Sequence, residues 1–154
     1  MPDRNSKKLI RLLLVDDHFV VREGIRSCLS SEKHLKILGE ASNGKDAIAK
    51  AKKLKPDIVL MDINMPEMNG IEATRELLRT QPDTKVLILT VHQRQEYVTQ
   101  LMQAGARGYV LKDTSPEELV RAIETVHQSN GFFTSIPLNA PPRAKHSSGF
   151  AFLP

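Results

Sequence analysis

The chain has 154 residues, which is enough for one ordinary domain with a sizeable hydrophobic core. Hydrophobic residues make up 40% of the sequence and charged residues 26%, the proportions of a soluble globular protein, and no apolar run approaches the ~20 residues of a membrane-spanning helix. The formal net charge of +4 is too small to indicate nucleic-acid binding by itself.

Two features of the sequence argue against export. Residues 1–8 are polar and contain no apolar core, so they do not resemble a secretory signal. Cys28 is the only cysteine, which excludes an internal disulfide and favours a reducing compartment. We therefore expect a cytoplasmic protein.

The first half of the chain alternates apolar runs with helical patterns. Residues 10–15 are typical of a buried strand, and apolar residues then recur at helical spacing over 21–29. Residues 35–41 predict a second strand, whose mixed composition favours a place near the edge of a sheet. A second helical pattern covers 47–54 and is stopped by Pro56.

The second half repeats this alternation three times. Short apolar runs predict three further buried strands, at 58–61, 86–89 and 108–111. A helical pattern follows each of them, over 71–78, 98–102 and 119–126. Gly105 is a plausible terminator of the middle helix. The last helix has the clearest start, because Ser115 can cap it and Pro116 fits its first position.

This alternation predicts a single α/β domain. Five strands with short connections through helices require a parallel sheet, covered by helices on both faces and joined by right-handed crossovers. We expect residues 1–8 to be disordered and residues 9–131 to form the domain. Residues 132–154 contain Pro, Ala and Ser without a clear periodicity, so we expect a linker-like tail there.

Four of the predicted strands end in polar side chains. In chain order, these residues are Asp16, Asp17, Asp62, Thr90 and Lys112. The carboxyl ends of parallel strands lie at one edge of a sheet, where open α/β sheets keep their sites. The fold would therefore gather three carboxylates, a hydroxyl and an ammonium into one site.

The charges of this predicted site indicate a cation and a phosphoryl group. Three crowded carboxylates repel one another unless a cation joins them, and Mg²⁺ suits a site with few carboxylates and several waters. Beside Mg²⁺, an aspartate such as Asp62 can attack a phosphorus centre and become an acyl phosphate. The Lys112 ammonium can hold a phosphoryl oxygen, and the Thr90 hydroxyl can bond to the phosphoryl group once it arrives.

Longer motifs surround these residues. The segments are 13–18 (LLVDDH), 61–70 (MDINMPEMNG), 89–90 (LT) and 104–112 (AGARGYVLK). Together they resemble the receiver domain of bacterial two-component response regulators, over residues 9–130, and most closely the NarL/FixJ subgroup with LuxR-type output domains. The resemblance implies a flavodoxin/CheY-like fold, a doubly wound five-stranded parallel sheet in the order 2-1-3-4-5.

The resemblance also implies a role for each acidic residue. Asp62 would accept the phosphoryl group from the phosphohistidine of a sensor histidine kinase. Asp17 would bind Mg²⁺ directly and Asp16 mainly through water, while Asp62 and the backbone carbonyl of Asn64 would complete the metal site.

Other residues would hold or report the phosphoryl group. Lys112 would pair with Asp62 and then with its phosphate, Thr90 would be the switch hydroxyl, and Tyr109 the aromatic whose rotamer reports the state. The side chains of Asn64 and His92 lie where the family tunes the lifetime of the phosphoryl group. The other histidines share no metal-ligand spacing, so we interpret them as surface or structural residues.

The resemblance implies an output as well. Phosphorylation would promote homodimerisation, and transcription would be controlled through a helix-turn-helix domain that these residues do not contain. Members of the subgroup usually continue into that domain, so the tail is either the start of a linker to it or the end of a receiver that works alone. Asp113 follows Lys112 where many receivers have proline.

Two other functions fit part of the pattern. An aspartate-nucleophile phosphohydrolase would need a second acid two residues after its nucleophile, and Asn64 occupies that position. A pseudo-receiver that serves only as an interaction module is disfavoured because the acids, Thr90 and Lys112 are all present. We therefore predict a phosphorylation-activated switch, which is no enzyme beyond assisting its own phosphotransfer and autodephosphorylation.

Overall fold

Alternating strands and helices form the core of the computed structural model, which describes residues 8–65, 67–91, 95–129, 131–134 and 151–153. The five predicted strands are present as β1 (Ile10–Val15), β2 (Leu35–Ala41), β3 (Ile58–Asp62), β4 (Lys85–Thr90) and β5 (Gly108–Leu111). The helices between and after them are α1 (Phe19–Leu29), α2 (Gly44–Leu54), α3 (Gly70–Thr80), α4 (Gln95–Ala104) and α5 (Pro116–Gln128).

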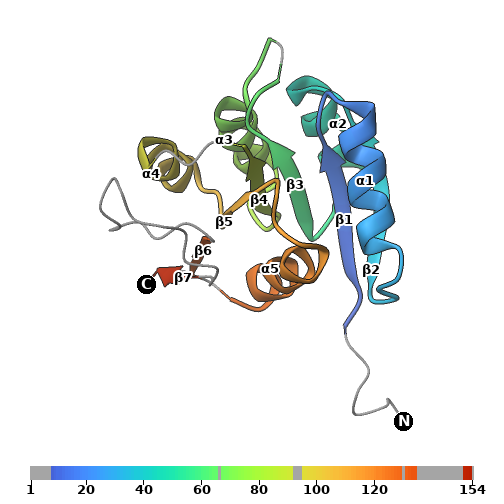
Figure 1. The fold of residues 1–154 in the computed structure, drawn as a ribbon. Coiled ribbons are helices and arrows are strands. Elements are labelled where there is room, and N and C mark those ends of the chain that lie inside the picture. Colours follow the sequence, from blue (N-terminus) through green and yellow to red (C-terminus); the bar gives the residue numbers. More distant parts are fainter. Residues whose placement is uncertain (1–7, 66, 92–94, 130, 135–150, 154) are drawn as a thin grey trace.

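The five strands are parallel, in the predicted order β2-β1-β3-β4-β5. Helices α1 and α5 cover one face of this sheet, and α2, α3 and α4 cover the other (Figure 1). β2 lies at the edge of the sheet, as its mixed composition predicts. The predicted fold class is therefore confirmed.

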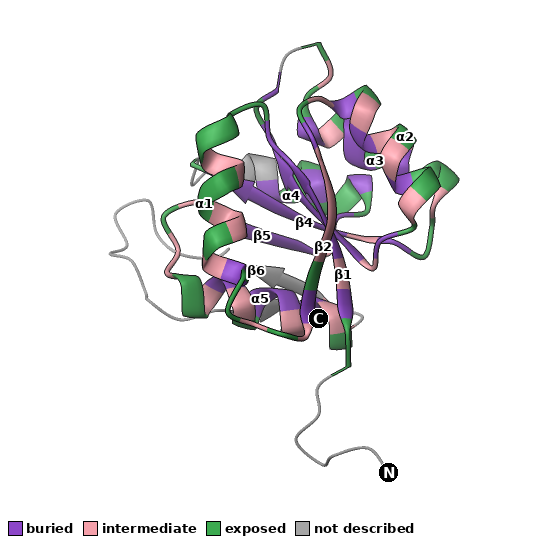
Figure 2. Ribbon diagram, turned by 90° about the vertical axis from the view of Figure 1, so that its right-hand side faces the viewer, coloured by how far each residue is buried: buried purple, intermediate pink, exposed green. Residues whose placement is uncertain are grey.

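Alternating side chains of each strand supply two hydrophobic cores, one on each face. Leu12 and Leu14 of β1 point to the α1 and α5 side, whereas Leu13 and Val15 point to the side of α2, α3 and α4. Figure 2 shows this burial along the strands and on the inner sides of the helices. Burial on both faces explains why the strands read as continuous apolar runs in the sequence.

The ends of two helices follow the local sequence signals. The Ser115 side chain accepts a hydrogen bond from the backbone N–H of Glu118, and Pro116 is the first residue of α5. Gly105, directly after α4, has a φ of 101°, a backbone conformation that glycine adopts easily. These caps fix where α4 and α5 meet the strand between them.

Two short strands extend the sheet beyond the predicted five. β6 (Phe132–Thr134) pairs in parallel with β5, and β7 (Ala151–Leu153) pairs antiparallel with β6. The sequence pattern does not predict these two strands, because three residues are too few to show a periodicity. The domain boundaries and the linker character of the tail stay predictions, and so does the expected disorder of residues 1–8, of which 1–7 lie outside the described part.

None of the helices in the described part of the chain combines the length and apolar character that crossing a membrane requires.

Candidate functional site

The polar strand ends meet at the carboxyl edge of the sheet. Asp62 and Thr90 are the last residues of β3 and β4, while Asp16 and Lys112 directly follow β1 and β5. Asp16, Asp62 and Thr90 are buried, and Asp17 is exposed beside them. The structure thus brings together the residues that the sequence analysis assigned to one site.

Lys112 bridges the two buried acids. Its Nζ donates to Asp16 Oδ2 at 2.7 Å and lies 3.2 Å from Asp62 Oδ1. Its own backbone N–H donates to the carbonyl oxygen of Thr90 at 2.7 Å, which ties the end of β5 to the end of β4. The ammonium is therefore held at the centre of the site and not free to swing into solvent.

Asp62 has one oxygen that the surrounding structure leaves unsatisfied. The Oδ2 atom is buried and, among the described residues, accepts no hydrogen bond. Buried polar atoms are nearly always paired, so an orphaned carboxylate oxygen calls for a partner that the described residues do not supply. The sequence places this oxygen at the end of a fully buried strand, β3.

Burial is the main influence on the charge of Asp62. Desolvation, followed by the negative charge of Asp16, raises the pKa of the Asp62 carboxyl, and Lys112 and the Asn64 backbone N–H oppose this shift. Burial by itself would lower the pKa of Lys112, but its hydrogen bond to Asp16 and the charge of Asp62 outweigh burial and raise it. Lys112 thus stays charged, whereas a further cation nearby would stabilise the ionised form of Asp62.

His18 joins the acidic cluster, although the sequence analysis gave it no role. Its Nδ1 lies 3.0 Å from Asp16 Oδ1 and 3.0 Å from Asp17 Oδ1, and its backbone N–H donates to Asp16 Oδ1 at 2.9 Å. One ligand atom from each of Asp16, Asp17, His18 and Asp62 lies within 4.8 Å of the others. The only sequence signal for His18 is that it directly follows the acidic pair.

Gly70 brings the start of α3 against the end of β3. Its backbone N–H donates to the carbonyl oxygen of Ile63 at 2.8 Å. A Cβ atom at this position would lie 2.4 Å from the Asp62 carbonyl oxygen and 2.7 Å from Ile63 Cα, distances that real structures do not show. Glycine is therefore required here, and its close approach fixes the backbone of the residue that carries the central carboxylate.

The remaining predicted site residues lie around this centre. Asn64 is exposed in the loop after β3, and Tyr109 is fully buried in β5. His92, the other predicted modulating residue, lies outside the described residues. The roles of Asn64, Tyr109 and His92 stay predictions.

The donor set suits a hard divalent cation. Asp16, Asp17 and Asp62 offer carboxylate oxygens, the ligands that Mg²⁺ prefers, and Asp62 Oδ2 is an acceptor without a donor. Exposure of Asp17 on one side leaves room for the waters that Mg²⁺ usually keeps. The residues present therefore fit a magnesium site.

Comparison with known proteins identifies the family. The family model of the response regulator receiver domain matches residues 12–124. The response regulator GacA of Pseudomonas aeruginosa is 49% identical over 118 residues, which are 77% of this chain and 55% of that protein. The response regulator UvrY of Escherichia coli (strain K12) is 44% identical over 127 residues, 82% of this chain and 58% of UvrY. The chain thus spans little more than half the length of these curated relatives.

Solved structures agree with this assignment. A two-component response regulator of the LuxR family from Aurantimonas sp. SI85-9A1 is 38% identical, with a TM-score of 0.76 over 79% of this chain and 86% of that one. The signal receiver domain of the putative response regulator NarL from Mycobacterium tuberculosis is 32% identical, with a TM-score of 0.75 over 80% of this chain and 100% of that one. The chain belongs to the family of response regulator receiver domains, and its relatives are of the LuxR/NarL type.

Proposed function

We propose that this chain is a signalling switch that accepts a phosphoryl group on Asp62 from a sensor histidine kinase. The observation that carries the proposal is the buried Asp62 Oδ2, which has no hydrogen-bond partner among the described residues, on a carboxylate that lies within the acidic cluster and contacts the Lys112 ammonium through its other oxygen. A carboxylate kept this way is available as a nucleophile.

The acidic residues would hold the cation. Asp17, Asp62 and the Asn64 backbone carbonyl would bind Mg²⁺ directly, and Asp16 mainly through water. Bound there, Mg²⁺ would neutralise the negative charge that develops on the phosphoryl oxygens during transfer. Because burial and Asp16 both raise the pKa of Asp62, a cation at this place also favours the ionised, nucleophilic form of that carboxyl.

The transfer itself needs little more than positioning. An Asp62 oxygen would form a bond to phosphorus while the bond from phosphorus to the donor's imidazole nitrogen breaks, and the imidazole would keep that electron pair. The Lys112 ammonium, 3.2 Å from Asp62 Oδ1, would exchange this contact for one to a phosphoryl oxygen. The Thr90 hydroxyl would then bond to the phosphoryl group, with Tyr109 following the change and Asn64 and His92 setting its lifetime.

The output would be a change in assembly. Phosphorylation would favour a homodimer and would control transcription through a DNA-binding domain outside these residues, in the cytoplasm. The chain would act on no external substrate, since its chemistry is limited to its own phosphotransfer and autodephosphorylation.

Labelling with a small phosphodonor tests the assignment of Asp62. Incubation with radiolabelled acetyl phosphate and MgCl₂ should label the parent chain, and EDTA should abolish the label. Asp62→Asn should remain unlabelled, whereas the matched control Asp113→Asn, which removes an exposed carboxylate beside Lys112, should label like the parent. Equal labelling of Asp62→Asn and the parent would show that the acceptor lies elsewhere.

Solution mass tests the proposed output. Light scattering should show a monomer alone and a dimer when beryllofluoride and Mg²⁺ are added. A mass that stays monomeric under both conditions would contradict dimerisation while leaving the phosphoacceptor assignment intact.

A further inference from the structure

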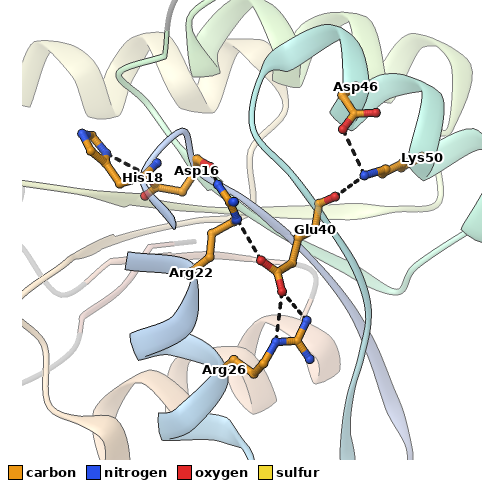
Figure 3. Close-up of polar contacts among 7 residues, drawn as sticks. All are labelled: Asp16, His18, Arg22, Arg26, Glu40, Asp46 and Lys50. Carbon is orange, nitrogen blue, oxygen red and sulfur yellow. Dashed lines mark hydrogen bonds and ion pairs between the residues drawn. The ribbon is translucent and has the colours of Figure 1, made fainter. Parts of the chain in front are cut away.

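A charged network links the acidic turn after β1, formed by Asp16 and Asp17, to the edge strand β2. It contains Arg22 and Arg26 of α1 and Glu40 of β2, none of which the sequence analysis singled out. Figure 3 shows Arg22 between Asp16 and Glu40, with Arg26 on the far side of the Glu40 carboxylate. The network lies outside the acidic cluster, so its purpose is not explained by the site as described so far.

Arg22 makes two different contacts with one guanidinium group. Its Nε donates to Glu40 Oε1 at 2.8 Å, and its Nη1 donates to the backbone carbonyl oxygen of Asp16 at 2.5 Å. The Arg22 side chain is only 15% exposed, and the Phe19 ring lies 5.8 Å from its Cζ atom. Arg22 is therefore held in one place, with one edge on β2 and another on the acidic turn.

Glu40 is held as firmly as Arg22. Its second oxygen, Oε2, accepts from Arg26 Nε at 3.0 Å and also from Arg26 Nη2. The hydrogen bond from Arg26 is the main reason that the pKa of Glu40 is lowered, and Arg22 adds to it, while burial opposes both. The Glu40 backbone is held too, because Lys50 of α2 donates to its carbonyl oxygen. The Glu40 carboxylate is thus held in one position, and through its hydrogen bond with Arg22 it orients the Arg22 guanidinium.

The carbonyl that Arg22 holds belongs to the peptide bond between Asp16 and Asp17. Because a peptide unit is planar, fixing its oxygen fixes the plane from which Asp17 projects. The N–H of Asp16 is held as well, since it donates to the Ala41 carbonyl oxygen at 3.0 Å. The direction of the Asp17 carboxylate therefore depends on a contact that comes from Arg22.

We propose that Glu40 and Arg22 are positioning residues that set the affinity of the acidic turn for Mg²⁺, although the Glu40 side chain is hydrogen-bonded to Arg22 and Arg26 and to no proposed metal ligand among the described residues. This inference rests on the proposed function, because that function assigns Mg²⁺ to Asp17 and Asp62. Glu40 acts by aiming Arg22 at the Asp16 carbonyl and by neutralising the Arg22 charge. Without Glu40, the guanidinium could turn to the carboxylates and compete with the cation.

Calorimetric titration of the full chain with MgCl₂ alone measures this effect. Glu40→Gln should weaken Mg²⁺ binding about tenfold, the low end of the loss typical of residues that orient metal ligands. Arg22→Lys should do the same, because a lysine keeps the charge but cannot reach Glu40 and Asp16 along two edges. The matched control is Arg26→Gln, which removes an ion pair from Glu40 and leaves the contact of Arg22 with Asp16.

The rate of labelling by acetyl phosphate separates positioning from damage. For Glu40→Gln and Arg22→Lys, the Mg²⁺ concentration that gives half the maximal rate should rise about tenfold, while the rate at saturating Mg²⁺ stays within about twofold of the parent. Arg26→Gln should lose thermal stability with little change in Mg²⁺ affinity.

Each outcome decides between the alternatives. Unchanged Mg²⁺ affinity in folded Glu40→Gln or Arg22→Lys would overturn the inference, and so would an equal loss in Arg26→Gln, which would indicate general loosening of α1. If Glu40→Gln does not fold, the result for Arg22→Lys decides. A parent chain that binds no Mg²⁺ would instead refute the proposed function itself.

Discussion

Replacing the central carboxylate should stabilise the protein when no cation is present. Asp62→Asn keeps the shape of the side chain but removes a buried negative charge whose Oδ2 has no hydrogen-bond partner among the described residues. Asp62 is 3% exposed, so bulk water has little access to that oxygen. We therefore expect the parent chain to pay a stability penalty that its function requires.

The size of the penalty follows from the cost of a buried, unsatisfied polar group, about 1–3 kcal/mol. Lys112 compensates the other oxygen of Asp62, so we expect a gain of about 2 kcal/mol in the free energy of unfolding for Asp62→Asn. For a chain of this length, that gain corresponds to a rise of roughly 4–8 °C in Tm. Scanning calorimetry in EDTA at pH 7.5 measures it directly.

The pH dependence gives the prediction its sign. Burial and Asp16 raise the pKa of Asp62 in the folded state above the ordinary value of 3.8. Between these two pKa values the folded parent binds more protons than the unfolded chain, so its stability relative to Asp62→Asn increases as the pH falls. The advantage of the variant should thus be complete above the raised pKa, shrink as the pH falls through it, and vanish below 3.8.

Mg²⁺ should reverse the order of the two proteins. A ligand at one hundred times its Kd stabilises the folded state by about 2.7 kcal/mol, and Asp62→Asn lacks one of the proposed metal ligands. Asp113→Asn, which changes an exposed carboxylate, should stay within about 0.5 kcal/mol of the parent. A less stable Asp62→Asn in EDTA at pH 7.5, or an advantage that does not shrink with falling pH, would refute the reasoning.

Two further substitutions test the surroundings of Asp62. Gly70→Ala should lower the free energy of unfolding in urea by about 1–3 kcal/mol, because the added Cβ would meet backbone atoms. The control Gly24→Ala in α1, where an added Cβ has nothing within 4 Å, should raise it by about 0.5–1 kcal/mol, and equal effects would show that the close approach at Gly70 is not required. His18→Ala should tighten Mg²⁺ binding severalfold in calorimetry, because the imidazole contacts a carboxylate oxygen of Asp17, the proposed direct ligand, and one of Asp16; unchanged or weaker binding would show that it does not compete.

The fold was predictable because its signals are local. The central strands are buried on both faces and read as apolar runs, and Ser115 with Pro116 marks the start of α5. That the charged residues of the candidate site would gather at one edge of the sheet was predictable for the same reason, since Asp16, Asp62 and Lys112 each directly follow such a run. Pairing of β6 with the edge of β5 has no comparable signal, because it depends on backbone contacts between short segments.

The network behind the site could not be found this way. Arg22 and Glu40 are eighteen residues apart, on a helix and a strand, and a charged residue on a surface helix usually indicates only a solvated face. Glu40 does contribute to the mixed composition of residues 35–41, which predicted an edge strand. Its pairing with Arg22 depends on the fold, which places α1 beside β2.

Two positive charges would lie opposite Asp62, the Lys112 ammonium and the proposed cation. The placement of both depends on Asp16. Lys112 is closer to Asp16, at 2.7 Å, than to Asp62, at 3.2 Å, so Asp16 is its stronger partner. Asp16 is in turn fixed at its carbonyl oxygen by Arg22. The same backbone anchor therefore aims Asp17 at the proposed cation through the shared peptide plane and holds the ammonium opposite Asp62 through the Asp16 side chain. Because the side chain has its own contacts with His18 and Lys112, loosening the anchor should weaken the cation site before it displaces the ammonium.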